Sequence, residues 1–297
     1  MKQQKRVLII GLGIGSMYKK LLEPFYEVVT VDTDESKNPT YSSLEKLISM
    51  GDTYFNLGIV CTPNYLHYEQ VHKILFFCNN VLVEKPGFKT SKELSYLYSI
   101  RKNVFLTKNN IYRVELPLIK EKIKDNFPDI KEVEINWINY SRVPHPGSWF
   151  TTKEKAFGGT SVDSFPHLLS ELLFILNNTS NVLNFSHSKE QRFKLEEVLD
   201  TDYGVPNPNG TYDVDDYCNL KLDSLKFSLT GNWKSNEKKE IGITIFYSNG
   251  KKEYFDFDLC PEYCYQLQFE EFLNLSEERR EYHHTMDLLI HQVIENL

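Results

Sequence analysis

The sequence predicts an α/β protein with an N-terminal doubly wound parallel sheet and a C-terminal α/β domain that holds a large, mostly antiparallel open sheet. Three observations support this prediction. Short apolar runs alternate with amphipathic segments up to about residue 110, as strands and helices do in a doubly wound sheet. A glycine-rich turn follows the first apolar run. Beyond residue 130, apolar and polar residues alternate within segments, which is typical of half-buried antiparallel strands.

The chain has 297 residues, which is enough for two domains with separate cores. We expect the two domains to be residues 1–110 and residues 111–297, with closing helices that could pack back on the first domain. Hydrophobic residues make up 41% and charged residues 25% of the chain, an ordinary globular mixture. The net charge of −7 without a basic run argues against nucleic acid or a membrane surface as partner.

Cysteine usage and the N-terminus bear on the compartment. Of the five cysteines, only Cys260 and Cys264 are closely spaced, and no second Cys or His pair follows at zinc spacing. We therefore expect free thiols, no metal site and a reducing, cytoplasmic location. The apolar run of residues 7–10 is too short for a signal peptide and gives way to glycines. No segment approaches the roughly 20 apolar residues that span a bilayer.

The first predicted strand, Arg6–Ile10, runs directly into a glycine-rich turn and a helix that reaches Pro24. Strand, glycine turn and helix form the context in which a backbone can approach a pyrophosphate at a helix N-terminus. Ser16 takes the place of the third glycine, where the helix packs on the strand. The predicted cofactor contacts of this turn are Gly11, Gly13, Ile14, Gly15 and Ser16. A tight turn without any ligand is the alternative.

The second predicted strand, Glu27–Val31, ends in Asp32, about 20 residues beyond the glycines. A carboxylate there can accept hydrogen bonds from both ribose hydroxyls, and it would repel a 2′-phosphate. NAD is therefore predicted over NADP. Asp34 favours the same choice, whereas the nearby Lys37 opposes it. The alternative is that Asp32 is a simple turn or cap residue.

The alternation of strands and helices continues in order along the chain. Its predicted elements are a helix over residues 44–48 capped by Ser42 or Ser43, a strand over Leu57–Cys61, a helix that carries His67, a strand over Asn79–Val83, a helix over Glu93–Ile100 capped by Ser91, and a strand over Val104–Leu106. The turn Thr62-Pro63-Asn64 follows the third strand, and Glu84-Lys85-Pro86-Gly87 follows the fourth.

Lys85 is the residue on which the predicted chemistry depends. Ligands collect at the carboxyl ends of parallel strands, which is where this lysine stands. A lysine that is desolvated in such a crevice loses part of its proton affinity, which suits it to proton transfer. A cis Lys85–Pro86 bond would be a rigid way to aim the side chain. The alternative is a solvated lysine before a turn.

The second half of the chain predicts a different architecture. Its predicted elements are a helix over Arg113–Asn126, a strand over Lys131–Tyr140 with Val133, Ile135 and Trp137 on one side, an antiparallel meander over residues 182–258, a loop over Gly204–Gly210, and closing helices over Glu262–Leu275 and Glu278–Leu297. Within the meander, Lys226–Trp233 alternates, and Ile241–Tyr247 pairs with Lys251–Leu259 across Ser248-Asn249-Gly250, a hairpin signal.

A second group of polar residues follows Gly158 and Gly159, which would let the backbone come close to a ligand. Asp163 and His167 are four residues apart, with Ser164 as the predicted helix cap and Pro166 in the first turn. Both side chains would then point into a cleft between the domains. The imidazole could accept a hydroxyl proton as hydride leaves the carbon, and Asp163 could orient it or bind a hydroxyl. Otherwise Asp163 caps the helix and His167 simply packs.

Taken together, these motifs resemble the glucose–fructose oxidoreductase/inositol dehydrogenase family (Gfo/Idh/MocA) in order and approximate spacing. The motifs are the glycine turn, Cys61-Thr62-Pro63-Asn64 with His67, Glu84-Lys85-Pro86, and Gly158-Gly159 followed by Asp163 and His167. The resemblance covers nearly the whole chain and is faint after residue 180. It implies an N-terminal Rossmann domain and a C-terminal domain whose sheet has one face at the active site and another often used for dimerisation, hence a homodimer or homotetramer.

The resemblance also implies roles for single residues. Lys85 would lie near the nicotinamide and substrate, His167 would be the acid/base, and Asp163 would bind or orient the substrate. Further implied contacts are Thr62, Pro63, Asn64, His67 and Glu84 for the cofactor, and Arg113 for the substrate. On position alone, the other substrate candidates are Arg142, His145 and Trp149, for which a surface loop is an equal alternative. Phe165 and Ser170 stand where many members have Gly and Asp, which bears on the substrate more than on the chemistry.

We therefore predict an NAD(P)-dependent oxidoreductase that transfers a hydride between nicotinamide and a secondary-alcohol carbon of a sugar, polyol or sugar derivative. Two alternatives are kept. A redox-neutral NAD user, such as an epimerase or a glycosidase, would retain its cofactor through purification and show no net change in nicotinamide absorbance. A non-catalytic protein that senses NAD and a ligand would not need Lys85, Asp163 and His167 together.

Overall fold

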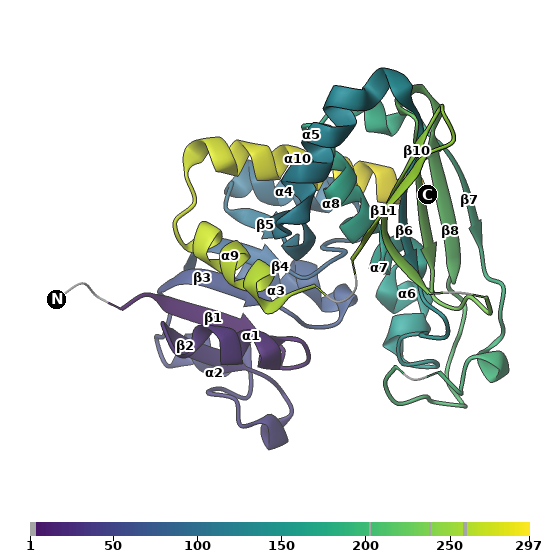
Figure 1. The fold of residues 1–297 in the computed structure, drawn as a ribbon. Helices are drawn as coiled ribbons and strands as arrows, with labels where there is room; N and C mark the ends of the chain where they lie inside the picture. The colour runs from purple at the N-terminus through teal and green to yellow at the C-terminus, as the bar shows by residue number, and fades with distance from the viewer. Residues whose placement is uncertain (1–3, 202, 238, 258–259) are drawn as a thin grey trace. The chain divides into compact units, whose positions relative to one another are not determined.

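The computed structural model describes residues 4–201, 203–237, 239–257 and 260–297. The chain divides into two compact units: unit 1 is Met1–Asn109 with Pro261–Leu288, and unit 2 is Asn110–Cys260 with Leu289–Leu297. One unit holds a parallel sheet and the other a mostly antiparallel one, so the predicted α/β fold class is confirmed (Figure 1). The assignment of cofactor binding to the first part of the chain and substrate binding to the second stays a prediction.

The sheet of unit 1 is five-stranded and parallel throughout, in the order β2-β1-β3-β4-β5. Its strands are β1 (Arg6–Ile10), β2 (Glu27–Val31), β3 (Phe55–Val60), β4 (Cys78–Val83) and β5 (Val104–Leu106). Successive residues of β1 belong to separate cores: Leu8 and Ile10 to one, Val7 and Ile9 to the other. Because side chains alternate across a strand and both faces are covered, the strands read as continuous apolar runs.

The helices of unit 1 match the predicted alternation. They are α1 (Gly15–Leu22), α2 (Leu44–Ser49), α3 (His67–Ile74), α4 (Ser91–Ile100), α9 (Glu262–Leu273) and the first part of α10 (Glu277–Glu295). Ser43 caps α2 as expected. For α4 the predicted cap, Ser91, is wrong: Thr90 accepts a hydrogen bond from the N–H of Glu93, and Glu93 reaches back to the N–H of Thr90. This capping box fixes the start of the helix one residue earlier.

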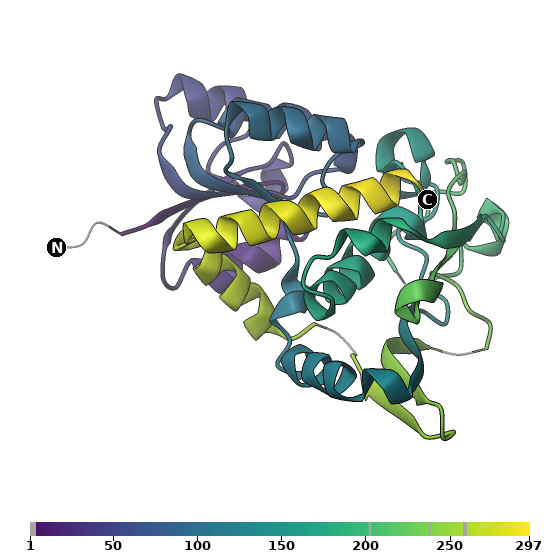
Figure 2. The same ribbon diagram turned by 90° about the horizontal axis from the view of Figure 1, so that it is seen from above.

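Buried polar side chains join the first part of α10 to the rest of unit 1. Asp287 forms an ion pair with Lys108, and both side chains are almost fully buried. The second carboxylate oxygen of Asp287 accepts a hydrogen bond from the N–H of Leu106, at 3.0 Å. The ring of His284 stacks on Phe105 at 4.8 Å and lies 4.2 Å from the ring of Tyr98 in α4. Figure 2 shows this part of α10 beside α4.

The two buried histidines of α10 predict acid sensitivity. Burial lowers the pKa of His283 to about 3 and that of His284 to about 4, against about 6.5 in an unfolded chain. Below pH 6.5 the unfolded state therefore binds more protons than the folded state, so stability is complete above pH 6.5 and is lost as the pH falls. We expect each of the two histidines to lower the free energy of unfolding by about 2 kcal/mol as the pH falls from 6.5 to 5.

Urea unfolding at several pH values measures this loss. His284→Phe, which keeps an aromatic ring against Phe105, should flatten the pH dependence between pH 6.5 and 5. His187→Phe is the matched control, because His187 is exposed in the sheet of unit 2. An unchanged slope in His284→Phe would contradict the assignment of the loss to this ring.

The sheet of unit 2 has six strands in the order β11-β10-β6-β9-β8-β7. They are β6 (Ile130–Ile138), β7 (Ser186–Glu190), β8 (Tyr217–Leu222), β9 (Phe227–Asn232), β10 (Glu240–Tyr247) and β11 (Lys252–Asp256). The predicted hairpin at 248–250 is confirmed as the β10–β11 pair, although residues 258–259 of its predicted second strand lie outside the described residues. The edge strand β7 is exposed at every residue.

The predicted meander over residues 182–258 is confirmed for the antiparallel pairs β7–β8, β8–β9 and β10–β11 and is wrong between β9 and β10. Strand β6 lies between β9 and β10, antiparallel to β10 and parallel to β9. The chain therefore crosses over β6 between β9 and β10 instead of making a hairpin there. The reason is packing: the inward residues Val133 and Ile135 of β6 are fully buried, and such a strand is most stable in the interior of the sheet.

Helices α7 (Thr160–Asp163) and α8 (Phe165–Ile175) cover the inward face of this sheet. Helix α5 (Glu115–Asn126) packs on α8, and α6 (Lys153–Ala156) packs on the turn Trp149–Thr151. Helix α8 packs on β6 and β9, and its leucines at 168, 169, 172 and 173 are buried. The sheet therefore presents one apolar face to these helices, while the outward face carries polar side chains such as Glu132 and Thr230.

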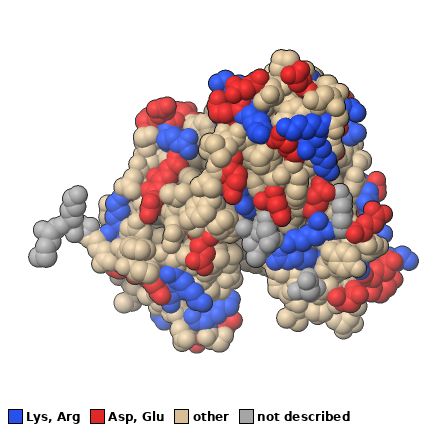
Figure 3. Space-filling model, in the orientation of Figure 1, with Lys and Arg blue, Asp and Glu red and all other residues tan. Residues whose placement is uncertain are grey.

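The helices, the surface charges and the cysteines concern the surroundings in which the protein could act. None of the helices within the described ranges is both long and apolar enough to cross a membrane. On the face shown in Figure 3, acidic and basic side chains are interspersed rather than gathered by sign. Cys61, Cys78 and Cys218 are free thiols.

Candidate functional site

The three glycines of the turn after β1 differ in how much space their backbone leaves for a side chain. Gly11 has φ +90°, and a Cβ there would lie 2.8 Å from the carbonyl oxygen of Cys61, so a side chain is excluded. A Cβ on Gly15 would lie 2.9 Å from Cγ2 of Ile9 in β1. A Cβ on Gly13 would meet no atom within 4 Å. Gly11 and Gly15 are therefore required by the fold, whereas Gly13 leaves open space next to the backbone.

The predicted role of Ser16 in helix–strand packing is wrong, because Gly15 makes that approach. The hydroxyl of Ser16 instead donates to the carbonyl oxygen of Leu12, at 2.7 Å. The N-cap position of α1 is Ile14, which makes no side-chain cap, and the first turn of α1 has no acidic residue. The positive end of this helix is thus not neutralised by the chain's own first turn, and its chemistry fits a phosphate group.

Asp32 stands directly after β2, and both oxygens of its carboxylate accept hydrogen bonds. One oxygen accepts from the N–H of Leu12 at 2.6 Å and lies 3.2 Å from Nζ of Lys37. The other accepts from the N–H of Asp34 at 2.8 Å. Partial burial alone would raise the pKa of Asp32, but these hydrogen bonds outweigh it and lower the pKa. The structure thus holds an ionised carboxylate beside the glycine turn, which fits the diol of a ribose.

The turn after β3 is tied down by side chains from α3. The hydroxyl of Thr62 donates to Oε1 of Gln70 at 2.6 Å, and Asn64 is buried. The imidazole of His67 is fully buried. It lies 2.7 Å from the carbonyl oxygen of Thr62 through Nε2 and 2.8 Å from that of Gly87 through Nδ1. His67 thus bonds to the backbone of the turn and does not reach the surface.

The turn after β4 carries Lys85. Its Lys85–Pro86 bond is cis, and the N–H of Gly87 donates to the carbonyl oxygen of Glu84 at 3.0 Å. The hydroxyl of Tyr18, in α1, donates to the carboxylate of Glu84. Burial raises the pKa of Glu84. The side chain of Lys85 is half-buried, so its surroundings combine partial desolvation with a neighbouring carboxyl group.

In unit 2, Asp163 and His167 belong to consecutive helices, α7 and α8. Ser164 occupies the N-cap position of α8, as predicted, but it has helical backbone angles and its side chain makes no capping hydrogen bond. Pro166 is in the first turn of α8, as predicted. Both functional side chains are half-buried, so the structure brings this predicted pair together at one helix junction.

Two tryptophans hold this pair, and the sequence-based reasoning missed both roles. Nε1–H of Trp233 donates to Oδ2 of Asp163 at 3.0 Å. The ring of Trp137 stacks on the ring of His167, with centroids 5.1 Å apart and an interplanar angle of 21°. Trp137 is opposite Gly231 in the β6–β9 pair, and Trp233 follows β9 directly. The available signal was the position of Trp137 on the inward face of its strand.

The Gly158–Gly159 turn serves the fold in a way that was not predicted. The N–H of Gly159 donates to Oδ1 of Asp215 at 3.0 Å, and the N–H of Ser161 donates to Oδ2 of Asp215 at 2.7 Å. A Cβ on Gly159 would collide with the backbone of Asp215. The close approach that this glycine permits is therefore to the chain's own backbone, which fixes the start of α7 ahead of Asp163.

The remaining substrate candidates lie in other parts of unit 2. Arg113 is 4% exposed, and its guanidinium lies 4.7 Å from the ring centroid of Phe257. Burial raises the pKa of Glu171 to about 8, and the charge of Arg113 opposes this rise. Trp149 begins the short helical turn Trp149–Thr151, where its ring packs on Phe150 at 4.3 Å.

The chain is similar to known proteins in sequence and in fold. Residues 5–104 match the profile of the oxidoreductase family with an NAD-binding Rossmann fold (Gfo/Idh/MocA). The chain is 29% identical over 266 residues to a protein of Amycolatopsis mediterranei (strain S699) that is assigned as the oxidoreductase subunit of a UDP-kanosamine synthase. The match covers 80% of this chain and 71% of that protein.

Solved structures show the same fold. GenD2 from gentamicin A biosynthesis, in complex with NAD, superposes with a TM-score of 0.72 at 15% identity, over 99% of this chain and 93% of that one. The WlbA dehydrogenase of Bordetella pertussis, in complex with NADH and UDP-GlcNAcA, superposes with a TM-score of 0.68 at 16% identity, over 97% and 94% of the two chains. At these identities the likeness concerns the fold.

Proposed function

We propose that this chain, whose residues 5–104 match the Gfo/Idh/MocA oxidoreductase family, uses NAD to oxidise or reduce a secondary-alcohol carbon of a sugar, polyol or sugar derivative. The observation that carries this proposal is the grouping at the carboxyl edge of the parallel sheet of unit 1. There the open space at Gly13, the ionised Asp32 and the turn with Lys85 follow β1, β2 and β4.

The similar proteins support a sugar derivative as the substrate class. One is assigned to UDP-kanosamine synthesis, and another was solved with UDP-GlcNAcA. We propose that this chain acts on a carbohydrate-like small molecule of that kind. We also propose the cytoplasm as its location, on the ground that Cys61, Cys78 and Cys218 are free thiols.

Residues of this chain would then divide the work as follows. The nicotinamide supplies the hydride acceptor or donor. Lys85 and His167 hold and move the hydroxyl proton, since a carbinol that loses hydride must also lose this proton. Asp163, held by the indole N–H of Trp233, orients the substrate or His167. Asp32 would bind the ribose hydroxyls, and the turn after β3 (Thr62, Pro63 and Asn64) and Glu84 would contact the cofactor.

A nicotinamide-absorbance screen tests this function. Purified protein is mixed with NAD or NADH and a panel of sugars, polyols, nucleotide sugars and their keto forms. Turnover that changes the absorbance and that disappears in a Lys85 variant supports a dehydrogenase. NAD that co-purifies and drives substrate conversion without a net absorbance change would instead favour the epimerase or glycosidase. Tight NAD binding and a silent panel would favour the sensor.

Cofactor choice is tested at Asp32. Asp32→Asn removes the negative charge that repels a 2′-phosphate and frees Lys37, whose Nζ lies 3.2 Å from Oδ2 of Asp32. We expect NAD binding to weaken about tenfold, the cost of weakening a hydrogen bond to a charged group, and NADP binding to strengthen. Calorimetric titration with both cofactors measures the change.

A second substitution serves as the control for that test. Lys37→Gln in the Asp32→Asn background should remove the gain in NADP affinity, because no cation would then face the phosphate. Equal affinities for NAD and NADP in the unmodified protein would refute the assignment of Asp32.

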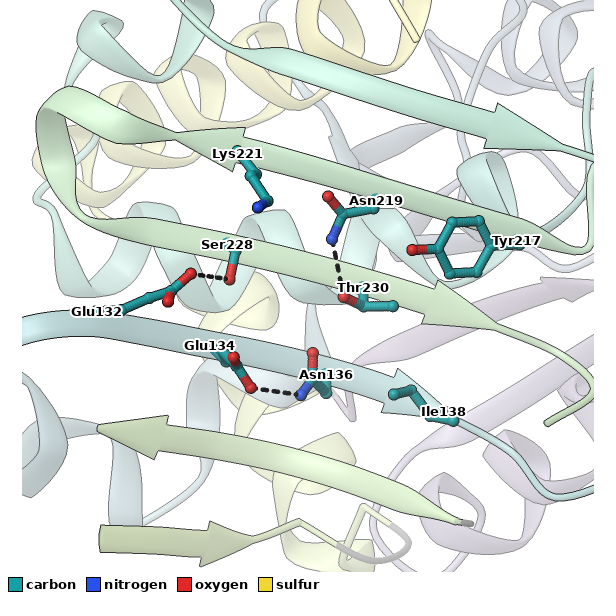
Figure 4. Close-up of a pocket in the computed structure, with 9 residues that line it drawn as sticks. All are labelled: Glu132, Glu134, Asn136, Ile138, Tyr217, Asn219, Lys221, Ser228 and Thr230. Carbon is teal, nitrogen blue, oxygen red and sulfur yellow. Dashed lines mark hydrogen bonds between the residues drawn. The ribbon is translucent and has the colours of Figure 1, made fainter. Parts of the chain in front are cut away.

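We further propose that two copies associate through the outward face of the sheet of unit 2. Figure 4 shows a hollow on that face. It is lined by Glu132, Glu134, Asn136 and Ile138 of β6, Tyr217, Asn219 and Lys221 of β8, and Ser228 and Thr230 of β9. Glu132 and Glu134 of β6 lie on one side of the hollow, and Lys221 of β8 lies on the other. A two-fold axis through the hollow would therefore place the acidic side chains of one copy against Lys221 of the other.

Lys221→Glu should break this association by placing like charges together. Light scattering after size exclusion would give the monomer mass for the variant and a dimer or tetramer mass for the unmodified protein. Lys189→Glu makes the same charge change on the edge strand β7 and should leave the mass unchanged. A monomeric unmodified protein would refute the proposed assembly.

A further inference from the structure

His67 occupies a position that its predicted role as a cofactor contact does not explain. It is the first residue of α3, its side chain is fully buried, and both ring nitrogens face backbone carbonyl oxygens. One carbonyl belongs to Thr62, five residues before it, and the other belongs to Gly87, twenty residues after it. A single ring thus spans two turns that come from different strands.

The two turns are those that the proposed function assigns to the cofactor and to proton transfer. The Thr62 turn follows β3, and the turn from Glu84 to Gly87 follows β4, its neighbour in the sheet. Lys85 lies inside the second turn, two residues before the carbonyl that His67 bonds. The other end of that turn is also held, because Tyr18 of α1 donates to the carboxylate of Glu84.

We propose that His67 is a positioning residue, whose ring ties the Thr62 turn to the Gly87 turn and thereby sets where Lys85 stands relative to the bound nicotinamide. This inference rests on the proposed function for the meaning of the two turns. It assigns to His67 a task inside the protein, beneath the site, in place of contact with the cofactor.

The chemistry of the ring suits this task. A neutral imidazole donates to one of the two carbonyl oxygens and packs its other nitrogen against the second, whereas a protonated imidazole donates to both. The tie between the turns is therefore strongest in the protonated ring. Burial lowers the pKa of His67, and the charge of Lys85 acts in the same direction, while the two carbonyl oxygens act against both. Replacing the ring by an apolar one would leave two carbonyls without this donor and would release the turns from each other.

Three variants test the proposal. His67→Phe keeps a ring of similar shape and removes both nitrogen contacts. His67→Gln offers two N–H donors on one nitrogen and should recover part of the function. His72→Phe is the matched control, since it makes the same change at an exposed position of the same helix. The readouts are NADH affinity by fluorescence, and amide hydrogen exchange of segments 62–66 and 84–88 by mass spectrometry.

For His67→Phe we expect the NADH dissociation constant to rise about tenfold and exchange to accelerate in both segments together. For His67→Gln, the dissociation constant and the exchange rates should lie between those of His67→Phe and the unmodified protein. For His72→Phe, both should match the unmodified protein. If a substrate is known, kcat should fall more than KM rises, because Lys85 is displaced. Should His67→Phe fail to fold, His67→Gln still gives the comparison.

Unchanged NADH affinity and unchanged exchange in a folded His67→Phe would overturn the proposal. Accelerated exchange in one segment only would also overturn it, because the two turns would then not be coupled through the ring. The proposed function fails separately: a protein that binds NADH but turns over no carbohydrate would refute the oxidoreductase assignment, while both readouts for His67 would keep their meaning.

Discussion

Replacing Lys85 with methionine should lower kcat by about a hundredfold or more while NADH binding stays close to that of the unmodified protein. Methionine keeps the length and apolar stem of the side chain and removes the group that carries the proton. The turn itself is held by the backbone bond between Gly87 and Glu84 and by the contacts of Tyr18 and His67, so the loss should be chemical and not structural.

Lys89→Met is the matched control for this experiment. Lys89 lies four residues further along the same loop and is exposed, so its loss should leave kcat unchanged. Stopped-flow or steady-state nicotinamide absorbance gives kcat, and NADH fluorescence gives the affinity. If Lys85→Met retained full turnover with the substrate found in the screen, proton transfer would have to be assigned to His167 alone.

Replacing Lys108 with methionine should lower the free energy of unfolding by about 3–5 kcal/mol, because it leaves the buried carboxylate of Asp287 without the opposite charge of Lys108. Lys108 is 1% exposed and Asp287 is fully buried. Burial raises the pKa of Asp287, and the lysine charge counters this effect. Urea unfolding followed by circular dichroism measures the change.

The double variant Lys108→Met/Asp287→Asn separates the charge from the shape. The amide that replaces the carboxylate would be neutral, and its side-chain oxygen could still accept from the N–H of Leu106. We therefore expect the double variant to be more stable than Lys108→Met alone, which a double-mutant cycle would record as coupling between the two sites. A double variant that is less stable than the single one would show that packing, and not charge, dominates at this position.

The parts of the molecule that could be predicted from sequence are those specified by neighbours along the chain. The strands of unit 1 are short apolar runs because both faces of a parallel sheet are buried, and their ends coincide with the glycine turn, Asp32 and Lys85. The hairpin at Asn249-Gly250 needs only its own turn chemistry. Even local signals can compete, however: Glu93 selects Thr90 over Ser91 as the cap of α4.

The parts that could not be predicted depend on residues far apart in the sequence. No residue near β9 or β10 in the sequence indicates that β6 lies between them. That order depends on which strand buries the most apolar surface in the assembled sheet. The bond of Trp233 to Asp163 joins residues 70 apart, and the pair of Lys108 and Asp287 joins residues 179 apart. The carbonyl contacts of His67 likewise appear only when two turns are brought together.

The exposed edge strand β7 has a consequence for how copies of this chain can meet. An uncovered strand offers unpaired backbone groups to any other strand and can seed open-ended aggregation. Here the edge carries Lys189 and Glu190, with all its side chains in solvent, so adding an identical strand would bury charges. The same sheet therefore resists growth along its edge, and its polar outward face is left as the surface through which a closed, finite assembly can form.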